Sequence, residues 1–291
     1  MDILKITYFG RFFKKGALAE RGTLGDSVKR RGGNAVILIF SGWGAGMVNS
    51  TGMSIFAGNK YRPSMKQADD SRAALCLQFL RDIAVHNNRE WFHEHRGEYD
   101  AARAAFESMV AELIARITVF DPAVQYLGVG DCTYRFYRDT RFSPDKSPYK
   151  RHFGAYINAK GKKAFQGGYY FHLEPENCML AGGSYCLPSD VLRAVRQSVC
   201  EQPEEFHAIV GSDPFHTLFP VIGETHVKTV PKGFPKDFPY PEYIRCKDYS
   251  CFHPVPESFF TSADWLERSA EVFQVMKPFL DFVNAAIDEA V

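Results

Sequence analysis

Two amphipathic helices are predicted early in the chain from the spacing of their hydrophobic positions. The apolar stripe of the first helix is formed by Leu75, Phe79, Leu80 and Ile83. Asp70 or Ser71 is expected to cap its start, because both side chains can accept a hydrogen bond from a free backbone N–H. The segment HNNREWF interrupts this pattern, and the second helix is predicted from about Glu98 to Thr118.

The middle of the chain changes to the period of two that is typical of strands. Apolar and polar residues alternate in residues 132–138, 152–158, 169–174 and 178–182. The expected inner face carries Phe153, Ile157, Phe171 and Leu173. Alternation then places Tyr170, His172 and Glu174 on the opposite face. Short links such as the Glu174–Asn177 turn favour an antiparallel meander over parallel strands.

Helical spacing returns in the last third of the chain. One helix is predicted after Pro188, and the last helix is predicted from about Ser262 to Ala290 with a kink or interruption at Pro278. The predicted fold class is therefore α+β: an antiparallel sheet, at about residues 132–182, with helices from the N- and C-terminal flanks packed on one face.

Residues 1–64 lack periodic apolar patterning. We expect them to be an extension that is either disordered or a mis-assigned start, and dispensable for folding. We expect residues 65–291 to form a single α+β domain. No apolar run reaches the roughly 20 residues that a membrane-spanning helix needs.

The net charge of +1 is unevenly distributed. Residues 1–64 contain ten Lys/Arg and three Asp/Glu, so their net charge is +7 and the remainder sums to 1 − 7 = −6. Within that acidic remainder, residues 134–156 contain six Lys/Arg and two Asp, a net charge of 6 − 2 = +4. Concentrated positive charge on an acidic body favours a local anion site over a broad nucleic-acid surface.

The basic segment YRFYRDTRFSPDKSPYKRHFGAY, residues 134–156, is therefore the first candidate site. Two Ser-Pro pairs stiffen its turn, and Arg and Lys side chains suit phosphate or carboxylate oxygens. The expected anion contacts are Arg135, Arg138, Arg141, Lys146 and Lys150. In the alternative interpretation Asp139 and Asp145 pair with these arginines and the turn only caps the sheet.

Two further segments could extend this site. NNREWFHEHR, residues 87–96, is either a helix junction anchored by Trp91 or a wall that supplies Arg89 or Glu90. The proline-rich segment VKTVPKGFPKDFP, residues 227–239, is either a solvated loop or a flap that adds Lys232 to the anion contacts.

Proton transfer is assigned to three candidates, Tyr149, His172 and Glu174. His172 and Glu174 are two residues apart on one strand face, so they can form a relay or supply two metal ligands. A hydrogen-bonded structural pair is the alternative. The sequence shows no zinc-ligand spacing, so no metal site is predicted from it, and no cofactor is identified.

The seven cysteines form no CxxC pair and no dense framework. Reduced, mostly buried thiols in a cytoplasmic protein are the expected interpretation, with a zinc site or a cysteine nucleophile as alternatives. No P-loop, GxGxxG or GxSxG motif occurs, which removes the commonest nucleotide-binding and hydrolase classes.

Four segments carry a resemblance to a known family: LRDIAVHNNREWFHEHRGEYDAAR, YRFYRDTRFSPDKSPYKRHFGAYI, GGYYFHLEPENCMLAGG and VPKGFPKDFP. They resemble the conserved hypothetical family called domain of unknown function 2461, from about Leu75 to the C-terminus. The RDxRFSxDKxPYK pattern, at Arg138 to Lys150, is the most specific part. The resemblance implies a single α+β domain, directs interest to the basic turn, and places the family's usual start near Met65. It implies no activity, substrate or cofactor.

Our leading hypothesis is a cytoplasmic protein that binds a small anionic ligand through the basic turn at residues 135–150, and whether it is also an enzyme is left open. The first alternative is a non-catalytic interaction module in which the Arg/Lys cluster is a structural salt-bridge network. The second alternative is nucleic-acid binding, which the net charge of −6 outside residues 1–64 disfavours. No membrane association is expected, and the oligomeric state is left open.

Overall fold

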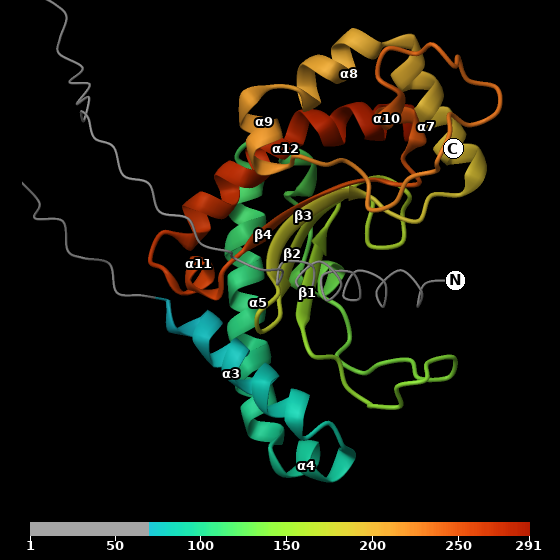
Figure 1. Cartoon of the computed structure of the whole chain (residues 1–291). Helices are drawn as coiled ribbons and strands as arrows, with labels where there is room; N and C mark the ends of the chain where they lie inside the picture. Colours follow the sequence, from blue (N-terminus) through green and yellow to red (C-terminus); the bar gives the residue numbers. More distant parts are fainter. Residues whose placement is uncertain (1–69) are drawn as a thin grey trace, which may run out of the picture. The chain divides into compact units, whose positions relative to one another are not determined.

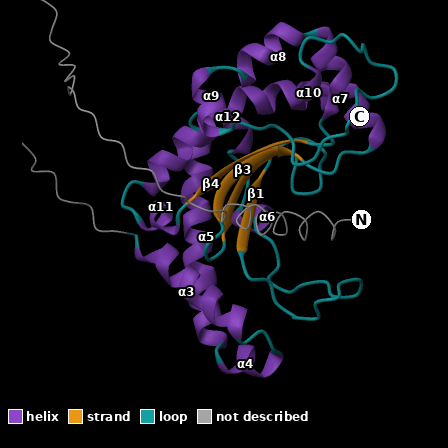
Figure 2. Ribbon diagram, in the orientation of Figure 1, coloured by secondary structure: helices purple, strands orange, loops and turns teal. Residues whose placement is uncertain are grey.

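The computed structural model of the chain describes residues 70–291, and the expectations for residues 1–64 lie outside this range. The described part is built around a four-stranded antiparallel sheet with the order β1-β2-β3-β4 (Figures 1 and 2). The strands are β1 (Phe153–Ile157), β2 (Gly168–Leu173), β3 (Cys178–Ser184) and β4 (Tyr249–Val255). The predicted α+β class with an antiparallel sheet is therefore confirmed.

The two predicted N-terminal helices are present. Helix α3 (Ser71–Val85) is capped by Asp70, whose carboxylate accepts a hydrogen bond of 2.9 Å from the backbone N–H of Arg72. A short helix, α4 (Arg89–Glu94), separates it from the long helix α5 (Arg96–Thr118). Two further short helices, η1 (Pro122–Val124) and α6 (Val129–Cys132), lead toward the sheet.

Six helices follow β3 in the described chain: α7 (Ser189–Glu201), α8 (Pro203–Val210), α9 (Asp213–Leu218), α10 (Pro241–Arg245), α11 (Glu257–Thr261) and α12 (Trp265–Asp288). Helix α12 continues through Pro278, so the interruption predicted there does not occur. Helices α7, α8 and α9 pack against α12 on the side away from the sheet (Figure 1).

One face of the sheet is apolar and is covered by helices α3, α5 and α12. The Phe171 ring lies 5.3 Å from the Phe106 ring of α5 and 6.1 Å from the Trp265 ring of α12. The four residues predicted for the inner face are all buried in this main core: Phe153, Ile157, Phe171 and Leu173. This placement confirms the period-of-two assignment for β1 and β2.

The opposite face of the sheet carries a second, smaller cluster. Tyr170, Met179 and Ala181 form its buried part, and Tyr134, Tyr156 and Phe252 pack against them. The Tyr156 hydroxyl donates to two backbone carbonyls, those of Gln166 and Gly183, at 3.1 and 2.9 Å. The strands are therefore buried on both faces, and the second face carries Tyr156, Tyr170 and His172 of β1 and β2.

The strand predicted at residues 132–138 is wrong. Cys132 ends helix α6, and only isolated bridges remain, from Thr133 to Ala155 and from Tyr137 to Tyr149. A regular strand here would have to pair continuously with β1. Only Thr133 forms a bridge to β1, and the chain then leaves the sheet toward the stiff loop at 139–147. The sheet also extends beyond residue 182, because β4 pairs with β3 through seven residues. Pro254 masks this strand in the sequence, since proline is rare inside a sheet.

We expect Gly183→Ala to destabilise the protein by at least about 2 kcal/mol. Gly183 has φ +111°, and an added Cβ would lie 2.2 Å from the carbonyl oxygen of Tyr249 on β4. The measurement is urea unfolding followed by circular dichroism.

Gly97→Ala is the matched control, because an added Cβ in α5 meets nothing within 4 Å. This change should leave stability equal or raise it by up to about 1 kcal/mol. Equal unfolding free energies for the two variants would show that the β3–β4 approach is not as tight as described.

Candidate functional site

The β1–β2 pairing brings four positions to one end of the polar sheet face. Phe153 pairs with Leu173 and Gly154 with His172, so His152 stands opposite Glu174, one step beyond the last pair. Alternation then directs His152, Gly154, His172 and Glu174 to the same side. We call His152, His172 and Glu174 the strand-end cluster.

The side chains of the strand-end cluster converge. The ligand atoms of His152, His172 and Glu174 all lie within 4.8 Å of one another. His172 is fully buried, and its Nε2 is 3.3 Å from a carboxylate oxygen of Glu174. The rings of His152 and His172 are 4.7 Å apart between centroids. The sequence-predicted pair is therefore present, with a second histidine beside it.

Neighbouring polar groups hold this cluster in position. The Tyr170 hydroxyl lies 2.9 Å from Nδ1 of His172, and the Asn177 side-chain amide donates to Glu174 at 2.6 Å. Tyr170 needs Gly154 on the adjacent strand, because a Cβ there would lie 2.6 Å from its hydroxyl oxygen. Burial raises the pKa of Tyr170 well above its usual range, so its hydroxyl stays protonated.

Positive charge surrounds His152. Burial holds its pKa well below the usual range, and His172, Lys150 and Arg138 lower it further. The imidazole is therefore neutral at physiological pH. Within residues 70–291, neither ring nitrogen of His152 makes a hydrogen bond. It therefore faces the His172–Glu174 pair with unused bonding capacity.

Lys150 lies next to this cluster and has no carboxylate partner among the described residues. Burial, with the Arg135 guanidinium adding to the effect, lowers its pKa to about 8. Its ammonium lies 5.4 Å from the centre of the Tyr134 ring, and Lys162 approaches the same ring at 5.6 Å. A narrow cavity of about 20 Å³, room for about one water molecule, borders Lys150, Arg135 and His152.

The other predicted anion contacts are bonded within their own loop. Arg138 donates to the Asp145 carboxylate at 2.8 Å and to the Ser147 carbonyl at 3.0 Å. Arg141 pairs with Asp139 at 2.7 Å, although 71% of the arginine side chain is exposed. Lys146 donates to the carbonyl of Thr140 at 2.9 Å.

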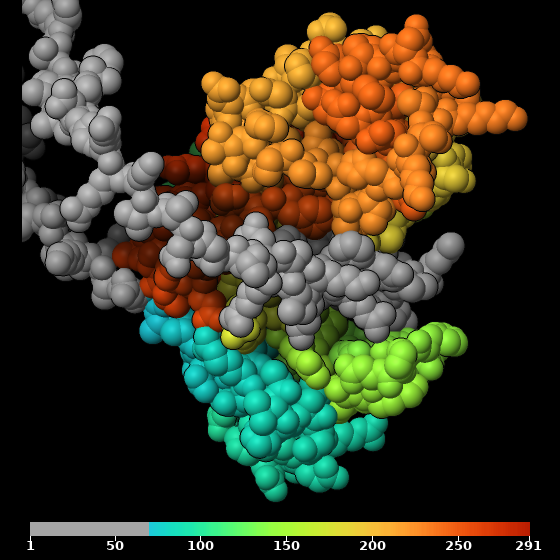
Figure 3. Space-filling model, in the orientation of Figure 1, coloured from blue at the N-terminus to red at the C-terminus, as the bar shows by residue number. Residues whose placement is uncertain are grey.

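This loop, residues 139–147, projects at the surface (light green in Figure 3). The hydrogen bond of Ser147 lowers the pKa of Asp145 to about 2, with Arg138 adding to the effect. The loop's carboxylates thus stay ionised at neutral pH, and each holds its cation locally.

Three predicted site residues are not brought to the strand-end cluster. Tyr149 belongs to the main core, with its ring 4.0 Å from that of Phe92, and burial raises its pKa. Arg89 is exposed on α4 near Tyr149. Lys232 is exposed on the loop between α9 and α10, and that loop lies at the opposite end of the described part from residues 139–147 (Figure 1).

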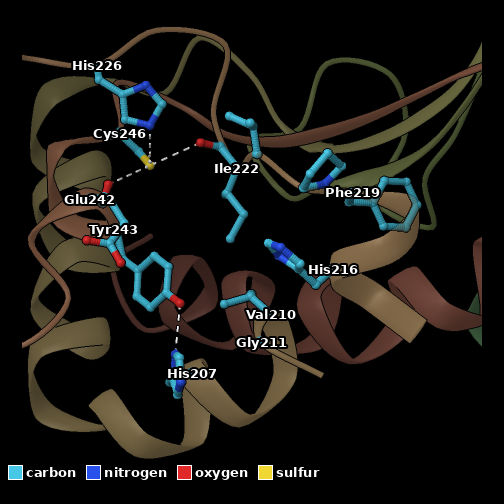
Figure 4. A pocket seen from close by; sticks show the side chains of 12 residues that line it. His207, Val210, Gly211, His216, Phe219, Ile222, His226, Glu242, Tyr243 and Cys246 are labelled. Carbon is cyan, nitrogen blue, oxygen red and sulfur yellow. Dashed lines mark hydrogen bonds between the residues drawn. The ribbon is translucent and has the colours of Figure 1, made fainter. Parts of the chain in front are cut away.

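A larger cavity, of about 470 Å³, lies between α8, α9 and α10 (Figure 4). None of the residues predicted from the sequence borders it. Val210, Phe219 and Ile222 line it with apolar surface. At its edge, the Tyr243 hydroxyl is hydrogen-bonded to Nδ1 of His207 at 2.9 Å. Such a volume is typical of small-molecule pockets.

Cys246 borders this larger cavity and lies 3.4 Å from Nε2 of His226. Burial, with Asp248 adding to the effect, raises the pKa of its thiol to about 12. The thiol also donates to the carbonyls of Glu242 and Ile222. Cys246 is therefore held as a neutral thiol and lacks the thiolate character of a nucleophile.

Fold and site together define an α+β protein whose polar sheet face ends in a cluster of two histidines and one glutamate, with Lys150 beside it. The chain belongs to the conserved hypothetical protein family DUF2461, whose profile matches residues 75–282. This match confirms the resemblance found in the sequence. No curated protein and no solved structure matches the chain significantly. Among residues 70–291, no helix has the length and apolar character needed to cross a membrane.

We expect Arg138→Ala and Arg141→Ala to differ in their effect on stability. Only 16% of the Arg138 side chain is exposed, and it bonds to Asp145 and Ser147, so its loss should cost about 1–3 kcal/mol. The exposed Arg141–Asp139 pair should contribute nothing measurable. Urea unfolding of both variants gives the comparison. A destabilisation by Arg141→Ala that equals the one by Arg138→Ala would contradict the loop geometry.

Proposed function

We propose that this protein binds a small molecule carrying a phosphate or carboxylate group at Lys150, beside the strand-end cluster. One observation carries the proposal: the half-buried ammonium of Lys150 lacks a carboxylate partner among residues 70–291. An ammonium withdrawn from water is unfavourable unless an opposite charge or hydrogen-bond acceptors compensate it. A bound anion supplies that compensation.

The surroundings of Lys150 suit an anion better than a structural carboxylate. The Tyr134 ring offers only its π face to the ammonium, which offsets part of the desolvation cost. The exposed guanidinium of Arg135 adds a second positive charge at the same opening. Because the cavity holds about 20 Å³, it admits little more than one oxygen of the ligand, and the rest of the ligand would lie outside.

The loop at 139–147 takes a different part in this proposal. The ion pairs of Arg138 with Asp145 and of Arg141 with Asp139 support the structural-network alternative for this loop. The anion contacts are therefore assigned to Lys150 and Arg135, with the loop as their support. A broad nucleic-acid footprint is disfavoured, because three of the predicted cations, Arg138, Arg141 and Lys146, already have carboxylate or carbonyl partners.

The cytoplasm is the compartment that we propose for this protein. All seven cysteines are free thiols, and five of them are buried. Thiols persist without pairing in a reducing environment, whereas oxidising compartments favour disulfides.

Lys150→Met should abolish the stabilisation of this protein by inorganic phosphate or sulfate. Wild-type protein should be stabilised by about 2.7 kcal/mol when the anion is present at a hundred times its dissociation constant. The variant itself should not be less stable, because methionine removes a poorly compensated charge from the same space. Thermal melts across an anion titration give both values.

Lys146→Met is the matched control, because Lys146 is exposed and bonded only to the Thr140 carbonyl. It should retain the full anion response. If Lys146→Met loses the response and Lys150→Met keeps it, the anion binds at the loop tip and the assignment to Lys150 is wrong.

A second candidate function is favoured by the 470 Å³ cavity between α8, α9 and α10. Its lining is mostly apolar, and Tyr243, His207 and Cys246 are already hydrogen-bonded within the protein. These features suit a small, largely uncharged aromatic or aliphatic molecule rather than an anion.

Val221→Trp tests this second candidate. Val221 lines the cavity but is 61% exposed, so an indole there fills the cavity without disturbing the core. An uncharged fragment such as indole should stabilise wild-type protein and lose that effect in the variant, as read from thermal melts. Equal responses of the two proteins would rule out binding in this cavity.

A further inference from the structure

The strand-end cluster has the composition of a metal site, and its residues are distinct from the Lys150 and Arg135 of the proposed anion contact. Two imidazoles and one carboxylate have their ligand atoms within 4.8 Å of one another. The sequence shows only two of the three, His172 and Glu174, because His152 joins them through strand pairing.

A purely structural role leaves part of this arrangement unexplained. A hydrogen bond between Nε2 of His172 and Glu174, at 3.3 Å, would account for those two residues alone. His152 contributes nothing to that bond, yet its ring lies 4.7 Å from the His172 ring and makes no hydrogen bond within residues 70–291. A third donor directed at a histidine–carboxylate pair points to a shared cation.

The groups around the cluster match those that orient metal ligands in proteins. A ligating histidine usually has its second ring nitrogen bonded to an oxygen, and ligating carboxylates are themselves hydrogen-bonded. Here the Tyr170 hydroxyl lies 2.9 Å from Nδ1 of His172, and Asn177 donates to Glu174 at 2.6 Å. Metal binding at Nε2 selects the tautomer in which Nδ1–H donates to the tyrosine oxygen.

We propose that His152, His172 and Glu174 bind a divalent first-row transition metal ion such as zinc. Imidazole and carboxylate together suit zinc and its neighbours, whereas magnesium and calcium prefer oxygen ligands. Bonds of about 2.0–2.1 Å to zinc separate tetrahedral ligands by about 3.3 Å. Nε2 of His172 and the Glu174 carboxylate oxygen already have this separation, so His152 is the group that has to move closer on binding. Three protein ligands leave a coordination position open, as in zinc sites that act on substrates.

The nearby cations couple this site to the proposed anion contact, and this part of the inference rests on the proposed function. Lys150 and Arg135 border the same narrow cavity as His152, so their positive charges lie beside the cluster. The same charges repel a metal dication, and an anion placed between the metal and Lys150 would offset the repulsion. Metal and anion should therefore each strengthen the binding of the other by the same factor.

The test is zinc binding by the full chain after removal of metals with a chelator, measured by competition with a chromophoric chelator. Wild-type protein should bind one equivalent of zinc. His152→Gln and Glu174→Gln, each of which removes a ligand, should weaken binding more than about 100-fold, and Tyr170→Phe by about 10- to 100-fold. His172 is avoided because it is fully buried and its replacement risks the fold.

His216→Gln is the matched control, because His216 is an exposed histidine at the other cavity. This variant should bind zinc as wild type does, and circular dichroism should show all variants folded. Cobalt(II) gives a second readout, since its visible absorption should appear in wild type and disappear in His152→Gln.

The inference is overturned if folded wild type binds no zinc at one equivalent, or if His152→Gln and Glu174→Gln bind as tightly as His216→Gln. Repeating the cobalt titration with sulfate separates the two proposals. Tighter cobalt binding with sulfate supports both. Site-specific cobalt binding that ignores sulfate upholds the metal site and counts against the anion contact. If wild-type protein responds to the anion but binds no metal, the anion contact is upheld and the metal site is overturned.

Discussion

The site depends on the strict alternation of side chains along β1 and β2. Because α3, α5 and α12 cover one face of the sheet with hydrophobic side chains, the imidazole of His172 has to face the other way. Antiparallel pairing then fixes which residues meet, and Gly154 opposite His172 sets the register. A slip of one residue would place His172 in the main core and Phe171 among polar groups. The apolar core thereby determines the geometry of a site that lies outside it.

Charge in the basic segment is divided between two environments. In the loop, Arg138 and Arg141 find carboxylates two to seven residues away, and Arg141 remains largely hydrated. At the strand end, Lys150 is removed from water and faces aromatic surface and another cation. Cationic side chains of one segment thus support the loop in one place and lack a carboxylate partner among the described residues a few positions later. Loop rigidity from Pro144 and Pro148 keeps the two environments separate.

The sequence predicts the parts of this protein whose signals are local. Helical spacing identifies α3, α5 and α12, and alternation identifies the buried face of β1 and β2, since each pattern is set by neighbours in the chain. It also identifies His172 with Glu174, which lie two residues apart. The segment at 132–138 has the right alternation, but it lacks a partner strand along most of its length.

What the sequence does not reveal depends on long-range pairing. His152 and Glu174 meet across a hairpin, and Lys150 meets Tyr134 through a long loop, so neither contact has a spacing that can be recognised in advance. The prediction of Tyr149 as a proton donor rested on its position in a basic segment. Its burial against Phe92 comes from helix α4, which is distant in sequence. One signal would have found His152. If residues 152–158 and 169–174 are paired as antiparallel strands, the position opposite Glu174 is His152.

The indole of Trp265 and the carboxylate of Asp70 join the two ends of the described chain. The indole N–H donates to the carboxylate at 2.7 Å across a separation of 195 residues. The same carboxylate caps α3, so one side chain contacts both the start of α3 and the start of α12. On a ribosome, α3 emerges long before α12 is made, so its bond to Trp265 has to wait for nearly the whole chain. Contacts of such separation slow folding, because the entropy of closing the loop is lost before the contact compensates for it. The nascent N-terminal helices would thus keep an uncovered hydrophobic face until synthesis is almost complete, which makes this stretch a natural binding site for chaperones during translation.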